Sequence, residues 1–182
     1  MQATTVLVEG ESDRLAMEAL ALRCDHDLAS ERVQIVPMGG ATSIVHYLER
    51  YGPKGANHRL LGLCDAGESR GIARALLRAG MGSGTLEERG FQVCDADLED
   101  ELIRCLGIEA VLEVIEAQGE LASFKLLQRQ PSLRERSVEA QLQRFFGGRS
   151  GNKIRYAPLL VFALPAGQAP PPLAHLVASI GM

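Results

Sequence analysis

Short apolar runs alternate with amphipathic stretches along the first hundred residues of the chain. The apolar runs are rich in Val, Leu and Ile, and glycine or acidic residues follow each of them, which predicts buried strands. The runs lie at residues 4–8, 33–37, 60–64 and 91–94. The stretches between them repeat apolar residues at helical spacing. This alternation predicts an α/β fold: a central parallel sheet of about four strands with helices on both faces.

Capping residues mark where the predicted helices begin. Ser12 or Asp13 can cap the helix after the first strand, and Thr42 or Ser43 can start the helix after the second. Asp97 is a plausible N-cap for a helix after the fourth strand. Three acidic residues follow it in the first turn, where the helix dipole favours negative charge.

Beyond the fourth strand the pattern changes to that of helices. Residues 120–146 are predicted to be mainly helical, with an interruption near Pro131. Residues 153–164 fit either a helix or a strand, and a helix is favoured because Pro158 is tolerable in a first helical turn. A last short helix is expected after the proline run that begins at Pro170.

Length and composition suit one compact domain with a small appendage. The chain has 182 residues, and 46% of them are hydrophobic, which is ample for a core. We expect residues 1–118 to form the α/β core with an acidic metal site. We expect residues 119–182 to form a mainly helical C-terminal extension packed on that core.

Charge and composition narrow the classes of function. The formal net charge of −4 argues against a protein that coats polyanions, but not against a nucleic-acid enzyme, because bound Mg²⁺ adds positive charge. Aromatic residues are only 4% of the chain, so base stacking is not the obvious binding mode. The four cysteines lie far apart and are expected to be reduced and mostly buried. Neither a leader peptide nor a membrane span is evident, so a cytoplasmic location is expected.

Acidic residues follow three of the four predicted strands. Glu9 and Asp13 come after the first strand, Asp65 after the third, and Asp95 or Asp97 after the fourth. Ligands of open parallel sheets bind outside the carboxyl ends of the strands, so these acids should share one rim. Carboxylates at short range repel unless a cation neutralises them, and oxygen ligands without His or Cys suit Mg²⁺ or Mn²⁺ rather than zinc. The sequence predicts a divalent-metal site, and separate caps and solvated charges are the alternative.

The motifs at these strand ends resemble those of a known family. Residues 6–13, VLVEGESD, look like the Glu-Gly-x-x-(Asp/Glu) opening of Toprim domains, which occur in topoisomerases, bacterial primases, small ribonucleases and OLD (overcoming lysogenisation defect) nucleases. Residues 65–67, Asp-Ala-Gly, depart from the usual Asp-x-Asp in a way that is typical of OLD-type Toprim domains. Residues 97–102, DLEDEL, are similar to the OLD acidic segment, and Lys153 is similar to the OLD downstream lysine. The resemblance covers nearly the whole chain and implies a Rossmann-like Toprim fold.

The resemblance implies a metal-dependent nuclease that hydrolyses phosphodiester bonds with two Mg²⁺ or Mn²⁺ ions. The expected metal ligands are Glu9, Asp13, Asp65, Asp97 and Glu99. Glu9, Asp65 and Lys153 are the expected catalytic residues. Glu9 could also act as the general base on the attacking water, and Lys153 could neutralise charge on the phosphate.

Some of these residues have simpler interpretations. Asp13 and Asp97 could each serve only as a helix cap, and Lys153 could be an ordinary surface lysine. Gly39 and Gly40 most simply permit a tight turn, although their amides could hold a phosphate.

A basic helix face has two interpretations as well. Arg70, Arg74 and Arg78 recur along one face of the third predicted helix. A solvated face is the simpler interpretation, and contact with a nucleic-acid backbone is the alternative.

Other classes of function stay open at this point. One is a non-catalytic Toprim module that binds or scaffolds DNA in repair. Another is nucleotidyl transfer of the primase type, which is disfavoured because neither a zinc-binding segment nor a basic priming subdomain is seen. The expected partner is nucleic acid, DNA rather than RNA, and no membrane. Full-length OLD proteins carry an ATPase before the Toprim part, so we expect a stand-alone Toprim domain with a separate ATPase as a candidate partner.

Overall fold

Four parallel strands form the centre of the computed structural model, which describes residues 2–180. The sheet order is β2-β1-β3-β4. The strands are β1 (Thr4–Val8), β2 (Val33–Pro37), β3 (Arg59–Asp65) and β4 (Phe91–Cys94). Each predicted strand is present, and β3 is one residue longer at each end than predicted. Asp65 is therefore the last residue of a strand rather than the first residue of a loop.

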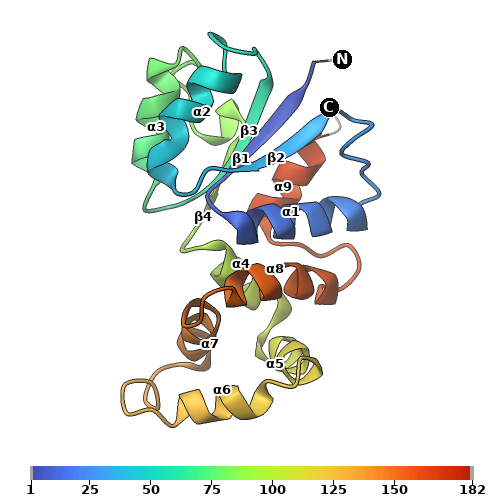
Figure 1. Cartoon of the computed structure of the whole chain (residues 1–182), viewed down its shortest axis with the longest axis vertical. Helices are drawn as coiled ribbons and strands as arrows, with labels where there is room; N and C mark the ends of the chain where they lie inside the picture. The colour runs from blue at the N-terminus through green and yellow to red at the C-terminus, as the bar shows by residue number, and fades with distance from the viewer. Residues whose placement is uncertain (1, 181–182) are drawn as a thin grey trace.

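Helices cover both faces of the sheet, which confirms the predicted α/β class. The helices between the strands are α1 (Glu11–Arg23), α2 (Ile44–Tyr51) and α3 (Ser69–Arg78), with short 3₁₀ turns η1 (Ala41–Ser43) and η2 (Glu87–Arg89). Because side chains alternate along a strand, β1 directs Val6 and Val8 into one core and Leu7 into the other. The core around Leu7 lies under α2 and α3, and the opposite core lies against α1 and the C-terminal helices (Figure 1).

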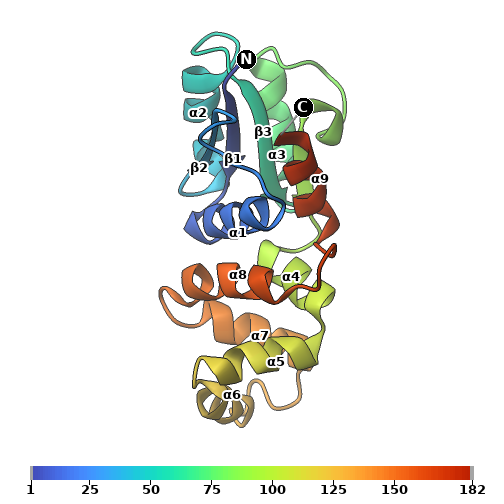
Figure 2. The same ribbon diagram turned by 90° about the vertical axis from the view of Figure 1, so that its right-hand side faces the viewer.

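The described chain beyond β4 is helical. Its helices are α4 (Leu98–Leu106), α5 (Ile108–Ala117), α6 (Leu121–Gln128), α7 (Val138–Gly147), α8 (Asn152–Ala163) and α9 (Pro171–Ile180). Helices α5, α6 and α7 form a lobe at one end of the molecule (Figures 1 and 2). Helix α8 returns to pack on α1, and α9 packs against β3 and β4. The boundary expected near residue 118 stays a prediction.

The predicted start of α1 is wrong by a few residues, whereas the predicted start of α2 is confirmed. Gly10 is the N-cap of α1 and has an extended backbone, so the helix begins at Glu11, ahead of Ser12. Asp13 instead reaches back from inside the helix, and its carboxylate accepts a hydrogen bond from the Gly10 N–H. Thr42 and Ser43 lie in the 3₁₀ turn η1, and Ser43 is the N-cap of α2, which begins at Ile44.

Residues 152–163 form a helix, which is the favoured prediction. The predicted position of its proline within the helix is wrong. Pro158 lies in the middle of α8 rather than in its first turn. Proline there cannot donate to the carbonyl of Ile154, one turn earlier. The side chain of Ile154 is 42% exposed, so this turn lies at the surface, where water can satisfy that carbonyl.

Each of the four cysteines carries a free thiol. Cys64 and Cys94 are buried on β3 and β4, and burial raises the pKa of Cys64 to about 12. Cys24 is exposed, so the expectation of burial holds for only part of the set. Within residues 2–180, no helix combines the length and the apolar character that crossing a lipid bilayer requires.

Candidate metal centre

A crevice is expected where the carboxyl ends of β1 and β3 lie side by side. The strand order runs from β1 to β2 in one direction and to β3 and β4 in the other, so the direction of winding reverses between β1 and β3. The loops that leave these two strands lead to opposite faces of the sheet, and ligands bind at such a switch point. Glu9 follows β1 directly, and Asp65 ends β3. Two of the predicted metal ligands therefore flank the switch point.

Asp65 experiences the charges of the other predicted ligands. Burial is the largest cause that raises the pKa of Asp65 to about 7, and the negative charges of Glu9, Asp13, Asp97 and Glu99 contribute to the same rise. Carboxylates influence one another in this way only when they are close in space. The five acids, Glu9, Asp13, Asp65, Asp97 and Glu99, are called the acidic cluster below. They lie in or directly beside β1, α1, β3 and α4 and are brought together by the fold.

Asp13 caps α1 and also faces the acidic cluster. Its Oδ2 atom accepts a hydrogen bond of 2.8 Å from the Gly10 N–H. The pKa of Asp13 is raised to about 6, mainly by burial; the bond from Gly10 lowers it, and the charges of Glu99 and Glu9 raise it. The two roles proposed for Asp13 are thus compatible, because the capping bond uses only one of its two oxygens.

Glu9 has an acidic neighbour that the sequence did not single out. Burial raises the pKa of Glu9, and the charge of Glu68 is the next largest cause, while Lys153 acts in the opposite direction. Glu68 is exposed at the start of α3, and its amide donates to the Asp65 carbonyl at 2.9 Å. Its place three residues after Asp65, in the turn that begins α3, is the sequence signal that could have placed it beside the cluster.

Asp97 combines a cap with a position in the acidic cluster. Its Oδ1 atom accepts a hydrogen bond of 2.8 Å from the Asp100 N–H, so it is the N-cap of α4 as predicted. Its Oδ2 atom lies 3.6 Å from Lys153 Nζ. One oxygen of the carboxylate therefore serves the helix while the other points to the cluster.

Glu99 is the most deeply buried member of the cluster and has one oxygen without a partner. Only 4% of the residue is exposed. Its Oε2 atom accepts a hydrogen bond of 2.8 Å from Lys153 Nζ, while its buried Oε1 atom has no hydrogen-bond partner within the described part of the chain. Burial lowers the pKa of Lys153, but the bond to Glu99 and the charges of Asp97 and Asp13 outweigh this and give a net rise. The structure thus places Lys153, an ammonium cation, inside the acidic cluster.

Two other acids of this region belong to a separate arrangement. Asp95 is 82% exposed and pairs with Arg104 at 3.1 Å. Glu101 is buried, but its Oε1 atom is occupied by the Asp95 amide at 3.0 Å and by Arg104 at 2.8 Å. Glu101 therefore holds the β4–α4 turn in place.

The donor set of the acidic cluster fits a divalent cation. Among residues 2–180, no group of three or more Asp, Glu, His or Cys side chains could hold a metal ion as it stands. Mutual repulsion favours spreading of the carboxylates, and Lys153 occupies one oxygen of Glu99. The buried Oε1 atom of Glu99 needs a cation or a donor, and carboxylate oxygens without a His or Cys partner are the ligands of Mg²⁺ and Mn²⁺.

The glycine pair after β2 supports the position of Glu9. Gly39 and Gly40 have φ angles of +71° and +118°, a region that favours glycine, so the tight-turn interpretation is sufficient. The Gly40 N–H donates to the Glu9 carbonyl at 3.0 Å. The turn after β2 is thereby attached to the first residue of the acidic cluster.

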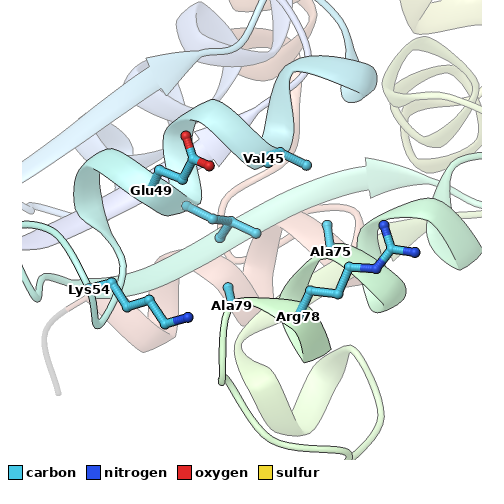
Figure 3. A pocket seen from close by; sticks show the side chains of 7 residues that line it. Val45, Glu49, Lys54, Ala75, Arg78 and Ala79 are labelled. Atoms are coloured by element: carbon cyan, nitrogen blue, oxygen red, sulfur yellow. The ribbon is translucent and has the colours of Figure 1, made fainter.

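A separate groove lies between α2 and α3, with no residue of the acidic cluster in its lining (Figure 3). It has a volume of about 220 Å³ and is lined by Val45, Leu48, Glu49, Lys54, Ala75, Arg78 and Ala79. Val45 of α2 is an apolar residue, yet it is half exposed in this groove. Arg70, Arg74 and Arg78 are all exposed on α3, and the Arg74 side chain donates to the Arg70 carbonyl.

A family model matches the N-terminal part of the chain. Residues 3–65 match the family described as overcoming lysogenization defect protein-like, TOPRIM domain. The match thus includes Glu9, Asp13 and Asp65 and ends before the acidic segment of α4. Among curated proteins, none matches the sequence.

Solved structures of OLD proteins share the fold over nearly the full length of the chain. The C-terminal region of the Burkholderia pseudomallei OLD protein superposes with a TM-score of 0.71 at 21% identity, covering 99% of this chain and 97% of that one. The C-terminal region of the Xanthomonas campestris pv. campestris OLD protein gives a TM-score of 0.71 at 21% identity, with 98% and 94% covered. The N-terminal third of the chain thus matches the OLD-like Toprim family, and the whole described chain shares the fold of the C-terminal regions of OLD proteins.

Proposed function

We propose that this protein is a metal-dependent endonuclease that hydrolyses phosphodiester bonds in nucleic acid, with DNA as the preferred substrate. The observation that carries the proposal is the acidic cluster at the switch point of the sheet, with a buried glutamate oxygen that has no partner among the described residues and an ammonium group beside it. The OLD-like family match supports the same activity.

The acidic cluster would hold Mg²⁺ or Mn²⁺, and two ions are expected. The ligands would be Glu9, Asp13, Asp65, Asp97 and Glu99. A bound divalent ion supplies Lewis acidity toward the phosphoryl oxygens and makes water a better nucleophile at neutral pH.

Glu9 and Lys153 have complementary chemical roles in this proposal. Burial raises the pKa of Glu9, so its carboxylate is a stronger base than a solvated glutamate and can accept the proton of the attacking water. The net rise in the pKa of Lys153 keeps its amine protonated. Its side chain is 43% exposed, so the ammonium can turn from Glu99 to donate to a phosphate oxygen that gains charge during the reaction.

Plasmid cleavage tests the proposal. Purified protein is incubated with supercoiled plasmid and Mg²⁺ or Mn²⁺, and nicked and linear products are expected. Glu9→Gln keeps the shape of the side chain but loses the base, and it should abolish cleavage. Glu49→Gln, at the α2–α3 groove, is the matched control and should cut like the wild type.

Two results would contradict the nuclease proposal. One is intact plasmid with both ions, and the other is equal cleavage by Glu9→Gln. DNA binding that is insensitive to EDTA and to Asp65→Asn, without cleavage, would instead support a non-catalytic module. Ribonucleotide incorporation on a single-stranded template would support nucleotidyl transfer. The separate ATPase partner and the cytoplasmic location stay predictions.

A further inference from the structure

Positive charge is concentrated in one segment of the chain. Residues 121–155 contain eight Lys and Arg and two acids, a formal charge of +6. Residues 1–120 contain eleven Lys and Arg and twenty-one acids, a formal charge of −10, and residues 156–182 contain neither kind. The net charge of −4 therefore averages an acidic core and a basic segment. Residues 121–155 are called the basic segment below; it covers α6, α7 and the start of α8.

Four of the eight cations of the basic segment are exposed and have no acidic partner among the described residues. Lys125, Arg129, Arg136 and Arg144 are all exposed, and none forms an ion pair with another residue between positions 2 and 180. Arg149 is 63% exposed and lies 3.9 Å from Glu120, at the outer limit of an ion pair. A surface with this excess of one sign of charge attracts polyanions.

The basic segment is joined directly to the acidic cluster. At one end, Lys153 bonds to Glu99 at 2.8 Å. Beside it, Gln143 of α7 donates to Asp100 of α4 at 2.8 Å, which attaches α7 to the first turn that carries Glu99. Arg144 follows Gln143 in sequence. The cations of the basic segment therefore begin beside the acidic cluster and continue away from it.

A groove between α6 and α7 extends this path. It has a volume of about 230 Å³, and its lining residues are Ser123, Leu126, Leu127, Gln130, Arg144, Phe145, Gly148 and Arg149. The lining thus combines two arginines with the polar side chains of Ser123 and Gln130. Arginine guanidinium groups bind phosphate through two parallel hydrogen bonds, and hydroxyl and amide groups also contact phosphates. Figures 1 and 2 show α6 and α7 together in the lobe below α4 and α8.

We propose that the basic segment binds the sugar–phosphate backbone of nucleic acid and leads it from the acidic cluster across α7 to α6. This inference rests on the proposed function, because the bound nucleic acid is the substrate that the acidic cluster would cleave. Interactions of this kind fix the position of the backbone and carry no sequence information. Binding is therefore tolerant of sequence and falls steeply with salt.

Fluorescence anisotropy with a labelled DNA duplex, in EDTA and at several KCl concentrations, tests the surface without cleavage. Arg144→Gln/Arg149→Gln should weaken binding several-fold and reduce the slope of log Kd against log salt by roughly 2, about one for each phosphate that the variant no longer neutralises. Arg50→Gln/Lys54→Gln removes the same charge from exposed positions at and after the end of α2, near the opposite edge of the sheet, and should bind like the wild type. Lys125→Gln/Arg129→Gln on α6 is a second test pair, used if the first variant loses its helical circular dichroism.

Three results would overturn the inference. One is wild-type affinity in both test pairs, and another is equal weakening by the Arg50/Lys54 control, which would indicate an effect of net charge alone. The third is competition by polyglutamate as strong as that by unlabelled DNA of equal charge, which would indicate an acidic protein partner. Loss of binding in the test pairs beside uncut plasmid in the wild type would remove the nuclease proposal and leave this surface standing.

Discussion

The ammonium of Lys153 lies 2.8 Å from Glu99 Oε2, although 54 residues separate the two in sequence. Only 4% of Glu99 is exposed, so water does little to stabilise its charge and the lysine carries much of that task. The pair joins α8 to α4, and α8 also packs on α1, the helix that carries Asp13. The C-terminal helices thus complete a cluster that begins at the end of β1.

Removal of Lys153 should destabilise the metal-free protein. Lys153→Met leaves Glu99 buried without its counter-ion, which should lower the free energy of unfolding by roughly 1–2 kcal/mol, less than for a fully buried pair because Lys153 is 43% exposed. Urea unfolding in EDTA measures this. The double variant Lys153→Met/Glu99→Gln should recover part of the loss, because the orphaned charge is then absent. Additive losses in the double variant would mean that the two side chains are not coupled.

Variants of Asp97 can separate its role as the N-cap of α4 from its role in the acidic cluster. Asn caps helices as well as Asp does, so Asp97→Asn should leave the free energy of unfolding in EDTA nearly unchanged, whereas Asp97→Ala should lower it by about 1 kcal/mol. Both variants lose the carboxylate oxygen that faces Lys153, so both should bind Mn²⁺ more weakly in calorimetric titration. Wild-type Mn²⁺ affinity in Asp97→Asn would show that Asp97 is a cap alone.

Stability of the metal-free protein should fall as the pH rises through the weakly acidic range. The pKa of Asp65 is raised to about 7 and that of Asp13 to about 6, from ordinary values of 3.8, because of burial and the neighbouring acids. The folded protein therefore binds protons more tightly than the unfolded chain. This contribution to stability is complete below pH 4 and is lost between pH 4 and pH 7. Urea unfolding in EDTA at pH 5 and pH 8 should show it.

The Asp65→Asn variant is the control for this pH dependence. It removes one titrating group of the cluster, so its stability should decline less between pH 5 and pH 8 than that of the wild type. Mg²⁺ should restore stability at pH 8 in the wild type more than in the variant, since a cation neutralises the charges that cause the loss. Parallel pH profiles for the two proteins would contradict the repulsion that we infer around Asp65.

The sequence predicts well those residues of the site whose positions are set by the geometry of the sheet. Carboxyl ends of adjacent parallel strands meet at one edge, so acids directly after β1 and β3 must be neighbours, as Glu9 and Asp65 are. Asp97 follows from the same argument applied to β4. These positions depend only on recognising short apolar runs and the residues that follow them.

Other parts of the site depend on interactions that a sequence pattern does not record. The pairing of Lys153 with Glu99 depends on the path of the three helices between them, α5, α6 and α7. The bond from Gly10 to Asp13 depends on the extended backbone of Gly10, which moves the start of α1 ahead of the residues chosen as caps. Glu68 is indistinguishable from a surface acid until the turn after Asp65 is placed. The overall charge of −4 likewise conceals the basic segment until the charges are divided among structural elements.

Glu99 and Glu101 offer an internal comparison for the metal centre, because both are buried glutamates in the first turn of α4. Glu99 Oε1 has no partner among the described residues and lies within the acidic cluster. Glu101 Oε1 is occupied by the Asp95 amide and Arg104. Glu99→Gln should therefore reduce Mn²⁺ affinity by at least about tenfold, in keeping with losses seen when metal-site partners are removed. Glu101→Gln should lower stability while its Mn²⁺ affinity stays that of the wild type.

Manganese binding followed by calorimetry, with unfolding in EDTA measured on the same preparations, separates these two effects. Glu99→Gln removes a buried charge and leaves the ion pairs of Arg104 in place. Glu101→Gln removes a charged partner of Arg104. Glu101→Gln should therefore lower the free energy of unfolding in EDTA more than Glu99→Gln does. The opposite order, with Mn²⁺ affinity lost in Glu101→Gln and kept in Glu99→Gln, would move the metal centre to the β4–α4 turn around Arg104. Wild-type Mn²⁺ affinity in both variants would exclude Glu99 as a ligand, and Lys153 would then be the permanent partner of Glu99.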